Sequence, residues 1–327
     1  MIVQPTPENI ERAARSLREG ALVAFPTETV YGLGADARNP DAVRRIFAAK
    51  RRPAAHPVIV HLAEASAIGR WASSAPAEAR ALAAAFWPGP LTLILPRAPG
   101  VSDAVTGGAE SVGLRVPAHP IARALLERFV ALGGDGIAAP SANLFGRVSA
   151  TTAQHVCDDF GDELALIIDA GACPHGIEST IVAFTEGEPL LLRLGAIPVE
   201  RIAAVLGRVP ASGGPNAPRA SGTLESHYAP RTPAKLLDAG ELRNAVGSLH
   251  GRGTHVAVLA HSLAQPASFE GVWFDAPAHD AAYAQELYAN LRALDALAAD
   301  EIWIEAPPDG PEWSAVRDRL RRATHRG

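Results

Sequence analysis

The chain has 327 residues, enough for two domains of ordinary size, and its 48% hydrophobic and 20% charged content is typical of a globular protein and excludes general disorder. The formal net charge of −5 argues against a protein that coats nucleic acid through bulk charge, but it leaves a local basic cleft open. No apolar run of the sequence approaches the roughly 20 residues that would span a bilayer.

Residues 6–206 are predicted to alternate between helices and short apolar strands. A hydroxyl at Thr6 and a proline at Pro7 begin the first helix, and Gly20 ends it, because these residue types suit helix ends. The apolar stretch 21–25 forms a buried strand that leads into a turn over 26–36. Further strands are predicted at 58–62, 91–95, 112–116, 137–139, 166–168, 180–184 and 190–193. Further helices are predicted at 39–50, at 64–86 with an interruption near Ser73, at 119–132, from about 151, and at 198–206.

A change of composition separates this region from the rest. Residues 208–233 are rich in glycine, proline and serine, and a connection of this length is either a disordered tether or a functional loop. The segment contains His227 and Tyr228, two rings that are unusual in a tether that only needs to be soluble. We therefore interpret 1–207 as the first domain and 208–233 as a linker, or lid, before a second domain at 234–327.

The second domain returns to a regular alternation. Strands are predicted at 234–237, 255–260 and 301–305, and helices at 241–249, 279–299 and 312–322. Strands that alternate with helices in this way indicate a small parallel sheet.

The turn after the first strand carries the most chemistry. Thr27, Glu28 and Thr29 offer hydroxyls and a carboxylate to a small polar ligand, and Lys50 and Arg52 at the end of the helix 39–50 suit phosphates. Each group also has a plainer interpretation: a turn with local side-chain bonds, and a solvated helix end favoured by the helix dipole.

Several other site types are not indicated. The phosphate loop with Gly-Lys-Ser/Thr and the dinucleotide fingerprint Gly-x-Gly-x-x-Gly are absent, as is a serine hydrolase elbow. His56 and His61 are too few and too poorly spaced for zinc, so each is expected at the polar edge of a site or in the core. Arg115 and Arg193 each end an apolar strand, where an arginine points into a cleft or extends to solvent.

Taken together, the motifs resemble those of the Sua5/YrdC/YciO family over about residues 5–207, and 226–230 is similar to the linker of its two-domain Sua5 subtype. The sequence departs from the family pattern at His56, where asparagine is frequent, and at Ser111, where threonine is frequent. The matching segments are Pro26–Gly34, Lys50-x-Arg52-Pro53, Trp87–Thr92, Arg115–Pro120, Ala139–Asn143, Gly176–Thr180 and Arg193-x-Gly195.

The resemblance implies an α/β (α+β) fold class. The first domain would be a YrdC-like twisted mixed sheet flanked by helices, and the C-terminal domain would be smaller and Rossmann-like. It also implies an enzyme, a nucleotidyltransferase that makes threonylcarbamoyl-AMP and pyrophosphate from L-threonine, bicarbonate or CO₂, and ATP, with Mg²⁺ accompanying ATP. The product feeds the threonylcarbamoyl modification of adenosine 37 in tRNA, t6A.

By the same resemblance, two sets of residues bind the two substrates, with Lys50 and Arg52 as the catalytic pair. The ATP set is Lys50, Arg52, Ser111, Ser141, Asn143, Ser149, Arg193 and Tyr228. The threonine set is Thr27, His61, Arg115, the backbone of Ala139, and Ser179. No protein metal cage is expected.

Two alternatives remain open. One is a module that binds double-stranded RNA or tRNA without catalysis, and the other is carbamoyl transfer, as in the related domain of hydrogenase maturation factors. A downstream t6A transferase complex is the expected partner of the enzyme, with tRNA contact possible but not required, and no membrane. The two cysteines, Cys157 and Cys173, and the absence of an N-terminal signal pattern predict a reduced, cytoplasmic protein.

Overall fold

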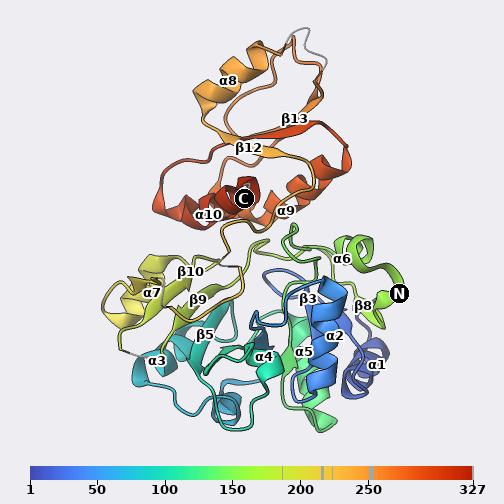
Figure 1. The fold of residues 1–327 in the computed structure, drawn as a ribbon, viewed down its shortest axis with the longest axis vertical. Helices are drawn as coiled ribbons and strands as arrows, with labels where there is room; N and C mark the ends of the chain where they lie inside the picture. Colours follow the sequence, from blue (N-terminus) through green and yellow to red (C-terminus); the bar gives the residue numbers. More distant parts are fainter. Residues whose placement is uncertain (186, 215–216, 223, 250–253, 326–327) are drawn as a thin grey trace. The chain divides into compact units, whose positions relative to one another are not determined.

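The computed structural model describes residues 1–185, 187–214, 217–222, 224–249 and 254–325. The predicted linker at 208–233 and the predicted C-terminal domain at 234–327 therefore each include positions outside the described residues. The chain divides into two compact units (Figure 1). The first comprises Met1–Phe145 and Ser149–Thr223, and the second comprises Gly146–Val148 and Leu224–Gly327.

The first unit is built on a mixed sheet, in which the described residues form eleven strands in the order β1-β8-β2-β3-β7-β4-β6-β5-β9-β10-β11. The strands are β1 (Ile2–Val3), β2 (Val23–Phe25), β3 (Gly32–Asp36), β4 (Ile59–His61), β5 (Leu91–Pro96), β6 (Ser111–Arg115), β7 (Ile137–Ala138), β8 (Leu166–Ile168), β9 (Thr180–Ala183), β10 (Leu190–Arg193) and β11 (Ala211–Ser212). Neighbours β4 and β6 are parallel, whereas β3 pairs antiparallel with both β2 and β7.

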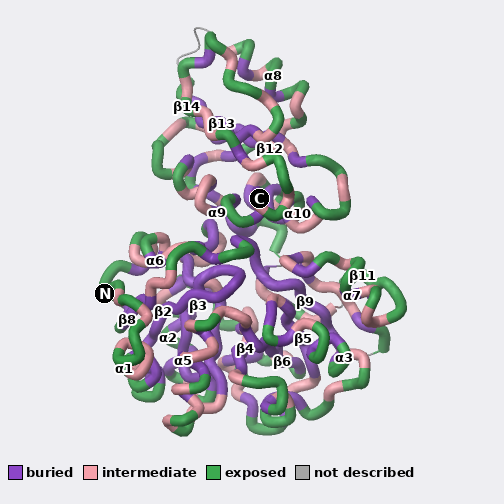
Figure 2. Tube along the Cα trace, turned by 180° about the vertical axis from the view of Figure 1, so that it is seen from behind, coloured by how far each residue is buried: buried purple, intermediate pink, exposed green. Residues whose placement is uncertain are grey.

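Helices cover both faces of this sheet, because alternate strand residues point to opposite sides. Ala24 packs in the core with α2 (Pro40–Lys50), α3 (Ala77–Phe86) and α6 (Ala153–Phe160), whereas Val23 and Phe25 pack with α1 (Pro7–Arg18) and α5 (Pro120–Ala131). The central strands are accordingly buried (Figure 2). The remaining helices of the unit are η1 (Ala65–Arg70), α4 (Asp103–Thr106), η2 (Gly161–Glu163) and α7 (Val199–Leu206).

One part of the sequence interpretation was wrong in this unit. The predicted turn over 26–36 ends at Val30–Tyr31, and Gly32–Asp36 is the buried strand β3. A Cβ on Gly34 would lie 2.9 Å from the side chains of both Ile137 and Phe25, so glycine allows β3 to pass close to its neighbours. Close packing between strands therefore accounts for the glycine at position 34. The helical segment predicted at 64–86 is interrupted near Ser73 as expected, since η1 ends at Arg70 and α3 begins at Ala77.

The second unit contains the predicted small parallel sheet, in the order β12-β15-β13-β14. Its elements are β12 (Ala234–Leu237), α8 (Ala239–Gly247), β13 (Val256–Ala260), β14 (Val272–Asp275), α9 (Asp280–Ala296), β15 (Glu301–Glu305), η3 (Pro311–Trp313) and α10 (Ser314–Thr324). Strand β14 was missed, because it is a short edge strand with partly exposed residues. The predicted fold class, a mixed sheet with helices followed by a smaller parallel α/β unit, is confirmed.

Both cysteines, Cys157 and Cys173, are free, as predicted. Over the described ranges, no helix is both long and apolar enough to span a membrane.

Candidate active site

The loop that follows β2 is ordered by its own hydroxyls. Thr27 Oγ1 donates to the carbonyl of Val30 at 2.6 Å and accepts from the amides of Thr29 and Val30 at 3.1 and 3.2 Å. The Thr27 and Thr29 hydroxyls are 2.9 Å apart. The local turn suggested by the sequence is therefore present, and it holds these two hydroxyls together inside the protein, where both threonines are buried.

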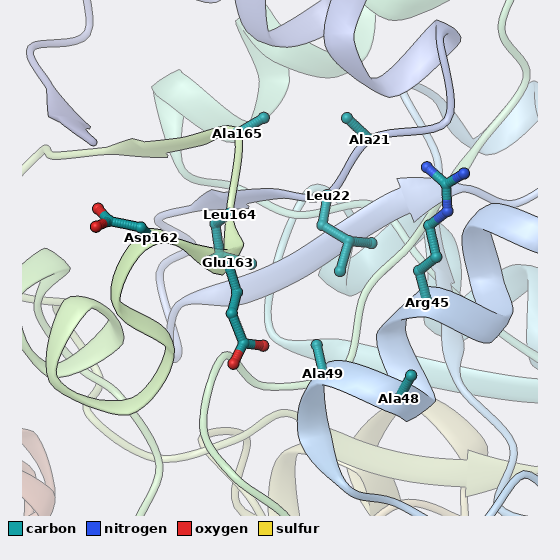
Figure 3. A pocket seen from close by; sticks show the side chains of 9 residues that line it. All are labelled: Ala21, Leu22, Arg45, Ala48, Ala49, Asp162, Glu163, Leu164 and Ala165. Carbon is teal, nitrogen blue, oxygen red and sulfur yellow. The ribbon is translucent and has the colours of Figure 1, made fainter.

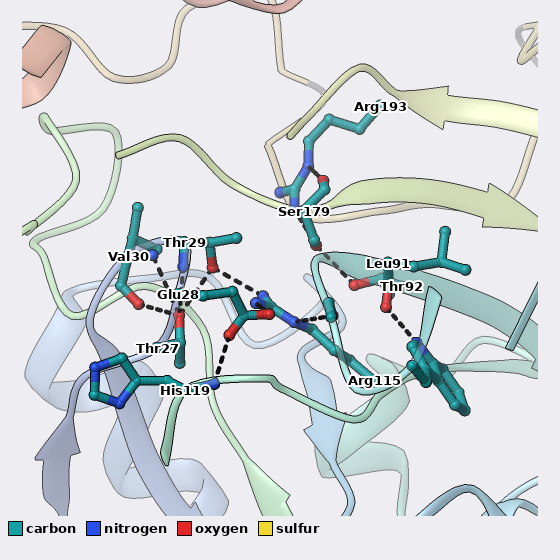
Figure 4. Close-up of polar contacts among 12 residues, drawn as sticks. Thr27, Glu28, Thr29, Val30, Leu91, Thr92, Arg115, His119, Ser179 and Arg193 are labelled. Atoms are coloured by element: carbon teal, nitrogen blue, oxygen red, sulfur yellow. Dashed lines mark hydrogen bonds and ion pairs between the residues drawn. The ribbon is translucent and has the colours of Figure 1, made fainter. Parts of the chain in front are cut away.

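A buried ion pair lies beside this loop (Figure 4). Arg115, the last residue of β6, donates from Nη2 to Glu28 Oε1 at 2.6 Å and from Nη1 to the Thr29 hydroxyl at 2.9 Å. Its Nε donates to the carbonyl of Gly89 at 3.3 Å. Burial acts to raise the pKa of Glu28, but the charge and hydrogen bond of Arg115 outweigh it, so the pKa is lowered and Glu28 remains a carboxylate.

Three histidines near this pair are held neutral. His61 ends β4, next to Arg115 in the parallel register, and burial, reinforced by the charge of Arg115, lowers the pKa of His61 to about 3. Burial likewise lowers the pKa of His119 and of His175, although the charge of Glu28 opposes it. The sequence had left His61 open between a site edge and the core, and the structure places it fully buried at the site edge of β4.

The segment 176–180 connects the two predicted substrate sets. The Ser179 hydroxyl is 2.8 Å from that of Thr92 and accepts from Arg193 Nη2 at 3.0 Å, while Arg193 Nε donates to the Ser179 carbonyl at 3.0 Å. A Cβ on Gly195 would lie 2.4 Å from the backbone of both Ser179 and Thr180. Glycine at this position is therefore what allows the backbones to come so close.

The cations at the end of α2 are not a solvated helix end. Lys50 is 1% exposed, and its Nζ donates to the carbonyl of Ser141 at 2.5 Å and to that of Asn143. Arg51 ends the helix in the left-handed conformation with φ 53°. Arg52, which follows it, is buried and donates from Nη2 to the carbonyl of Pro57 at 2.8 Å.

Backbone hydrogen bonds join several of these segments to one another. The amide of Ala142 donates to the carbonyl of Tyr31 at 2.7 Å, which joins the loop that Lys50 contacts to the end of the Thr27 loop. The amide of Ala139 donates to the carbonyl of Ile59 in β4 at 2.9 Å. The predicted residues of the first unit thus lie on adjoining segments instead of on unrelated surfaces.

Two of the predicted residues, Ser111 and Arg115, lie at different ends of β6. Arg115 and its neighbour His61 are at one end, and Ser111 is the first residue at the other. Four residues of strand separate Ser111 from Arg115 by about 13 Å. Since Ile59 pairs with Gly113, the same register brings Ser111 level with Pro57, the residue that Arg52 contacts.

Tyr228 belongs to the second unit, where it is buried. Its ring stacks on Tyr288 at a centroid distance of 5.6 Å, and the guanidinium of Arg319 lies 5.1 Å from its centroid. Its φ of 62° is uncommon for a residue other than glycine, and such strain persists where the surroundings enforce it. The predicted contact of Tyr228 with a nucleotide stays a prediction.

Sequence reasoning did not select several residues that the structure places here. The carboxylate of Glu178 accepts from the Ser149 hydroxyl at 2.7 Å, and Ser221 contacts both Arg52 and Arg193. Motif membership could have pointed to Thr92 and Glu178, because both lie inside matched segments, whereas no comparable signal marked Ser221.

A separate recess of about 660 Å³ opens beside α2 (Figure 3). None of the predicted site residues lines it. Its walls are Ala21, Leu22, Arg45, Ala48, Ala49, Asp162, Glu163, Leu164 and Ala165.

Comparison with known proteins places the chain in a family. The family model Sua5_yciO_yrdC, described as telomere recombination, matches residues 15–195, and the model Sua5_C, described as threonylcarbamoyl-AMP synthase, C-terminal domain, matches residues 197–324. The chain belongs to the Sua5 family. The resemblance inferred from the motifs is thereby confirmed.

Sua5 relatives match nearly the whole chain. Threonylcarbamoyl-AMP synthase of Pyrococcus abyssi is 39% identical and is aligned over 96% of this chain and 94% of its own length. The enzyme of the same name from Bacillus subtilis is also 39% identical, over 96% and 92%. The crystal structure of P. abyssi Sua5 complexed with L-threonine superimposes with a TM-score of 0.91 at 37% identity, covering 99% of this chain and 97% of that one.

Proposed function

We propose that the chain is an L-threonylcarbamoyladenylate synthase. It would convert L-threonine, bicarbonate or CO₂, and ATP into L-threonylcarbamoyl-AMP and pyrophosphate, for the t6A37 modification of tRNA. The observation that supports this most is that Sua5 relatives named as threonylcarbamoyl-AMP synthases match the chain along nearly its whole length.

The reaction requires no protein nucleophile. The ammonium group of threonine loses a proton to give the amine, which adds to CO₂ and loses a second proton to form a carbamate. A carbamate oxygen then attacks the α-phosphorus of ATP, so that a new P–O bond forms while the bond to the β-phosphate oxygen breaks and pyrophosphate leaves. Catalysis of such a transfer consists mainly of positioning and charge stabilisation.

The Glu28–Arg115 pair suits an amino acid. Threonine enters as a zwitterion, and a buried pair of opposite charges 2.6 Å apart presents a partner to each of its charged groups. Arg115 would meet the carboxylate while Glu28 keeps the guanidinium oriented and accepts from the ammonium group. The other threonine contacts would come from Thr27, His61, the Ala139 backbone and Ser179.

Phosphates would bind beside Lys50 and Arg52. Lys50 and Arg52 are buried cations whose side chains are already oriented by backbone carbonyls, so they would stabilise the charge of the transferring group without reorganising. These two are the proposed catalytic residues. The remaining nucleotide contacts would come from Ser111, Ser141, Asn143, Ser149, Arg193 and Tyr228.

Mg²⁺ would accompany ATP, bound mainly by the triphosphate and water. In the ranges that the structure describes, no group of three or more His, Cys, Asp and Glu side chains could hold a metal ion. We therefore assign no protein ligand to Mg²⁺. The requirement of the reaction for Mg²⁺ is checked by adding EDTA to the assay.

The intermediate would be passed on inside the cell. A carbamate is labile in water, so we include the linker as a cover for the site, with Tyr228 over the nucleotide. A t6A transferase complex is the proposed recipient of the product, direct tRNA contact is not required, and the cytoplasm is the proposed compartment.

A direct assay tests the proposal. Purified protein is mixed with threonine, bicarbonate, ATP and Mg²⁺, and threonylcarbamoyl-AMP and pyrophosphate are measured by mass spectrometry and a phosphate-release assay. Both products should appear together and disappear when threonine or bicarbonate is omitted. Pyrophosphate release that is indifferent to threonine would contradict the proposal.

A further inference from the structure

A short piece of the linker is docked on the first unit. Ala220 is 7% exposed and packs in an apolar cluster with Ile94, Ile181 and Ala183. Gly222, two residues later, has a φ of 80°, which glycine adopts without strain. The segment 220–222 is therefore held in a defined conformation on the face of β5 and β9.

Ser221, in the middle of this segment, contacts both arginines of the proposed ATP-binding set. Its hydroxyl accepts from Arg52 Nη2 at 3.1 Å, and its carbonyl accepts from Arg193 Nη1 at 2.8 Å. The same hydroxyl donates to the carbonyl of Pro57 at 3.1 Å. One residue thus presents two oxygen atoms to two guanidinium groups that come from distant parts of the chain.

The oxygens of Ser221 are neutral acceptors at a cationic site. Guanidinium groups bind phosphate oxygens more strongly, because an ionised acceptor adds the attraction between opposite charges and allows paired, bidentate hydrogen bonds. Both arginines also keep other anchors: Arg52 on the carbonyl of Pro57 and Arg193 on the backbone and hydroxyl of Ser179. Removal of Ser221 would therefore leave the two guanidinium groups in place for another ligand.

We infer that Ser221 is an internal competitor of the nucleotide: its two oxygens occupy positions at which Arg52 and Arg193 hold phosphate oxygens, and ATP must displace the segment 220–222 to bind. This inference rests on the proposed function, since it assumes a nucleotide at these arginines. It adds that the linker opposes nucleotide entry before it covers the site. The same competition favours departure of pyrophosphate after the reaction.

A direct contact between Ser221 and bound ATP would have the opposite effect on affinity. If Ser221 stayed in place and contacted ATP directly, its hydroxyl would contribute to nucleotide affinity. Removal of the hydroxyl would then weaken ATP binding, whereas removal of a competitor strengthens it. The sign of the change in the dissociation constant therefore distinguishes the two arrangements.

The test is calorimetric titration of the full chain with ATP and Mg²⁺, comparing wild type, S221A and S221D. S221A removes the bonds to Arg52 and Pro57, and we expect ATP to bind about 3- to 10-fold more tightly, the effect of one hydrogen bond on an equilibrium. S221D places a carboxylate at the two arginines, and we expect at least about 10-fold weaker binding, since hydrogen bonds to charged groups are the stronger class.

S226D is the matched control, because Ser226 is an exposed serine of the same linker and the variant carries the same added charge. We expect its ATP affinity to stay within about 2-fold of wild type, as for a screened surface charge. Weaker or unchanged ATP binding by S221A overturns the inference, as does equal weakening by S226D and S221D.

The outcomes also separate this inference from the proposed function. A wild-type protein that binds no ATP would overturn both. A wild-type protein that binds ATP and makes threonylcarbamoyl-AMP, with S221A no tighter, would overturn only the competitor. Should S221D fail to fold, as judged by circular dichroism, the direction of change in S221A decides.

Discussion

At the residue scale, the two buried charges of Arg115 and Glu28 neutralise each other within the protein. The side chains of Arg115 and Glu28 are 5% and 6% exposed, so each would carry a large desolvation penalty without the other. Arg115 also donates to the Thr29 hydroxyl and to the Gly89 carbonyl. Loss of one member therefore leaves the other as an uncompensated buried charge.

We predict that E28Q destabilises the first unit by about 3 kcal/mol or more, the usual effect of breaking a buried pair from one side. Urea unfolding of both proteins measures the difference. The matched control is E127Q, because Glu127 pairs with Arg123 on the surface of α5 with 60% of its side chain exposed. That variant should stay within about 0.5 kcal/mol of wild type. Equal stabilities of E28Q and E127Q would show that the buried pair contributes nothing.

A second prediction concerns pH. Because burial lowers the pKa of His61 from 6.5 to about 3, the unfolded chain holds a proton that the folded chain lacks between these values. The contribution of His61 to the free energy of unfolding is fully present above pH 6.5. It declines as the pH falls through this window, by up to about 1.4 kcal/mol per pH unit. Other histidines titrate in the same range, so only the difference from a variant isolates His61.

We therefore expect H61Q to lose less stability than wild type between pH 7 and pH 4.5, measured by urea unfolding at several pH values. Parallel profiles for H61Q and wild type would mean that His61 does not remain neutral in the folded protein.

The sequence identified many of the site residues, but it did not predict which of them contact one another. Motif resemblance selected Arg115, but the strand end alone did not say that Glu28 would neutralise it, because the two are 87 positions apart and meet only through the sheet. The same limit applies to Ser221. It has no distinctive neighbours in sequence, and its contacts with Arg52 and Arg193 span 169 and 28 positions.

At the element scale, short strands and turns position the site. Apolar stretches predicted most strands of the first unit, since strands such as β2, β6 and β9 are buried along their whole length. The misassigned element was β3, whose Gly32 and Gly34 resemble turn residues when read locally. The reason for these glycines is the approach of Phe25 and Ile137 from neighbouring elements, which local sequence does not contain.

Gly195 tests whether close backbone packing holds the segment 178–180 in place. A Cβ there would lie 2.4 Å from the Thr180 amide nitrogen and 2.5 Å from the Glu178 carbonyl oxygen, so G195A must displace the segment that carries Ser179. We expect a loss of about 2 kcal/mol or more and weaker threonine binding, measured by urea unfolding and calorimetry. G69A is the control, because no atom lies within 4 Å of a Cβ at Gly69. Normal threonine affinity in G195A would contradict this constraint.

The linker provides a further prediction at this scale. Deletion of 220–233 should leave the first unit folded, because its core is formed by residues that precede the linker. Synthesis of threonylcarbamoyl-AMP should fall steeply, since the proposed cover and Tyr228 are both removed. Circular dichroism checks the fold, and mass spectrometry follows the product. Unchanged turnover in the deletion would refute the cover.

At the scale of the whole molecule, the alternation of strands and helices predicted the parallel sheet of the second unit, whereas the family resemblance implied the mixed sheet of the first unit. The structure has both sheets. Composition limits the classes of ligand that the protein could bind, but it does not identify the ligand. A net charge of −5 makes sequence-independent RNA binding a weak hypothesis, whereas buried arginines beside hydroxyls favour small anionic ligands.

Salt dependence separates the enzyme from the RNA-binding alternative. Threonine is a zwitterion that would release few counterions, so its dissociation constant should change less than about 2-fold between 50 and 200 mM salt. A module that neutralised 6–10 phosphates of RNA would lose about 10³- to 10⁵-fold in affinity over the same range. Calorimetry with threonine and fluorescence anisotropy with labelled tRNA measure the two, and glycine serves as the control amino acid. Tight, steeply salt-dependent tRNA binding by a protein indifferent to threonine would favour the module, because the same arginines would then be neutralising a phosphate backbone.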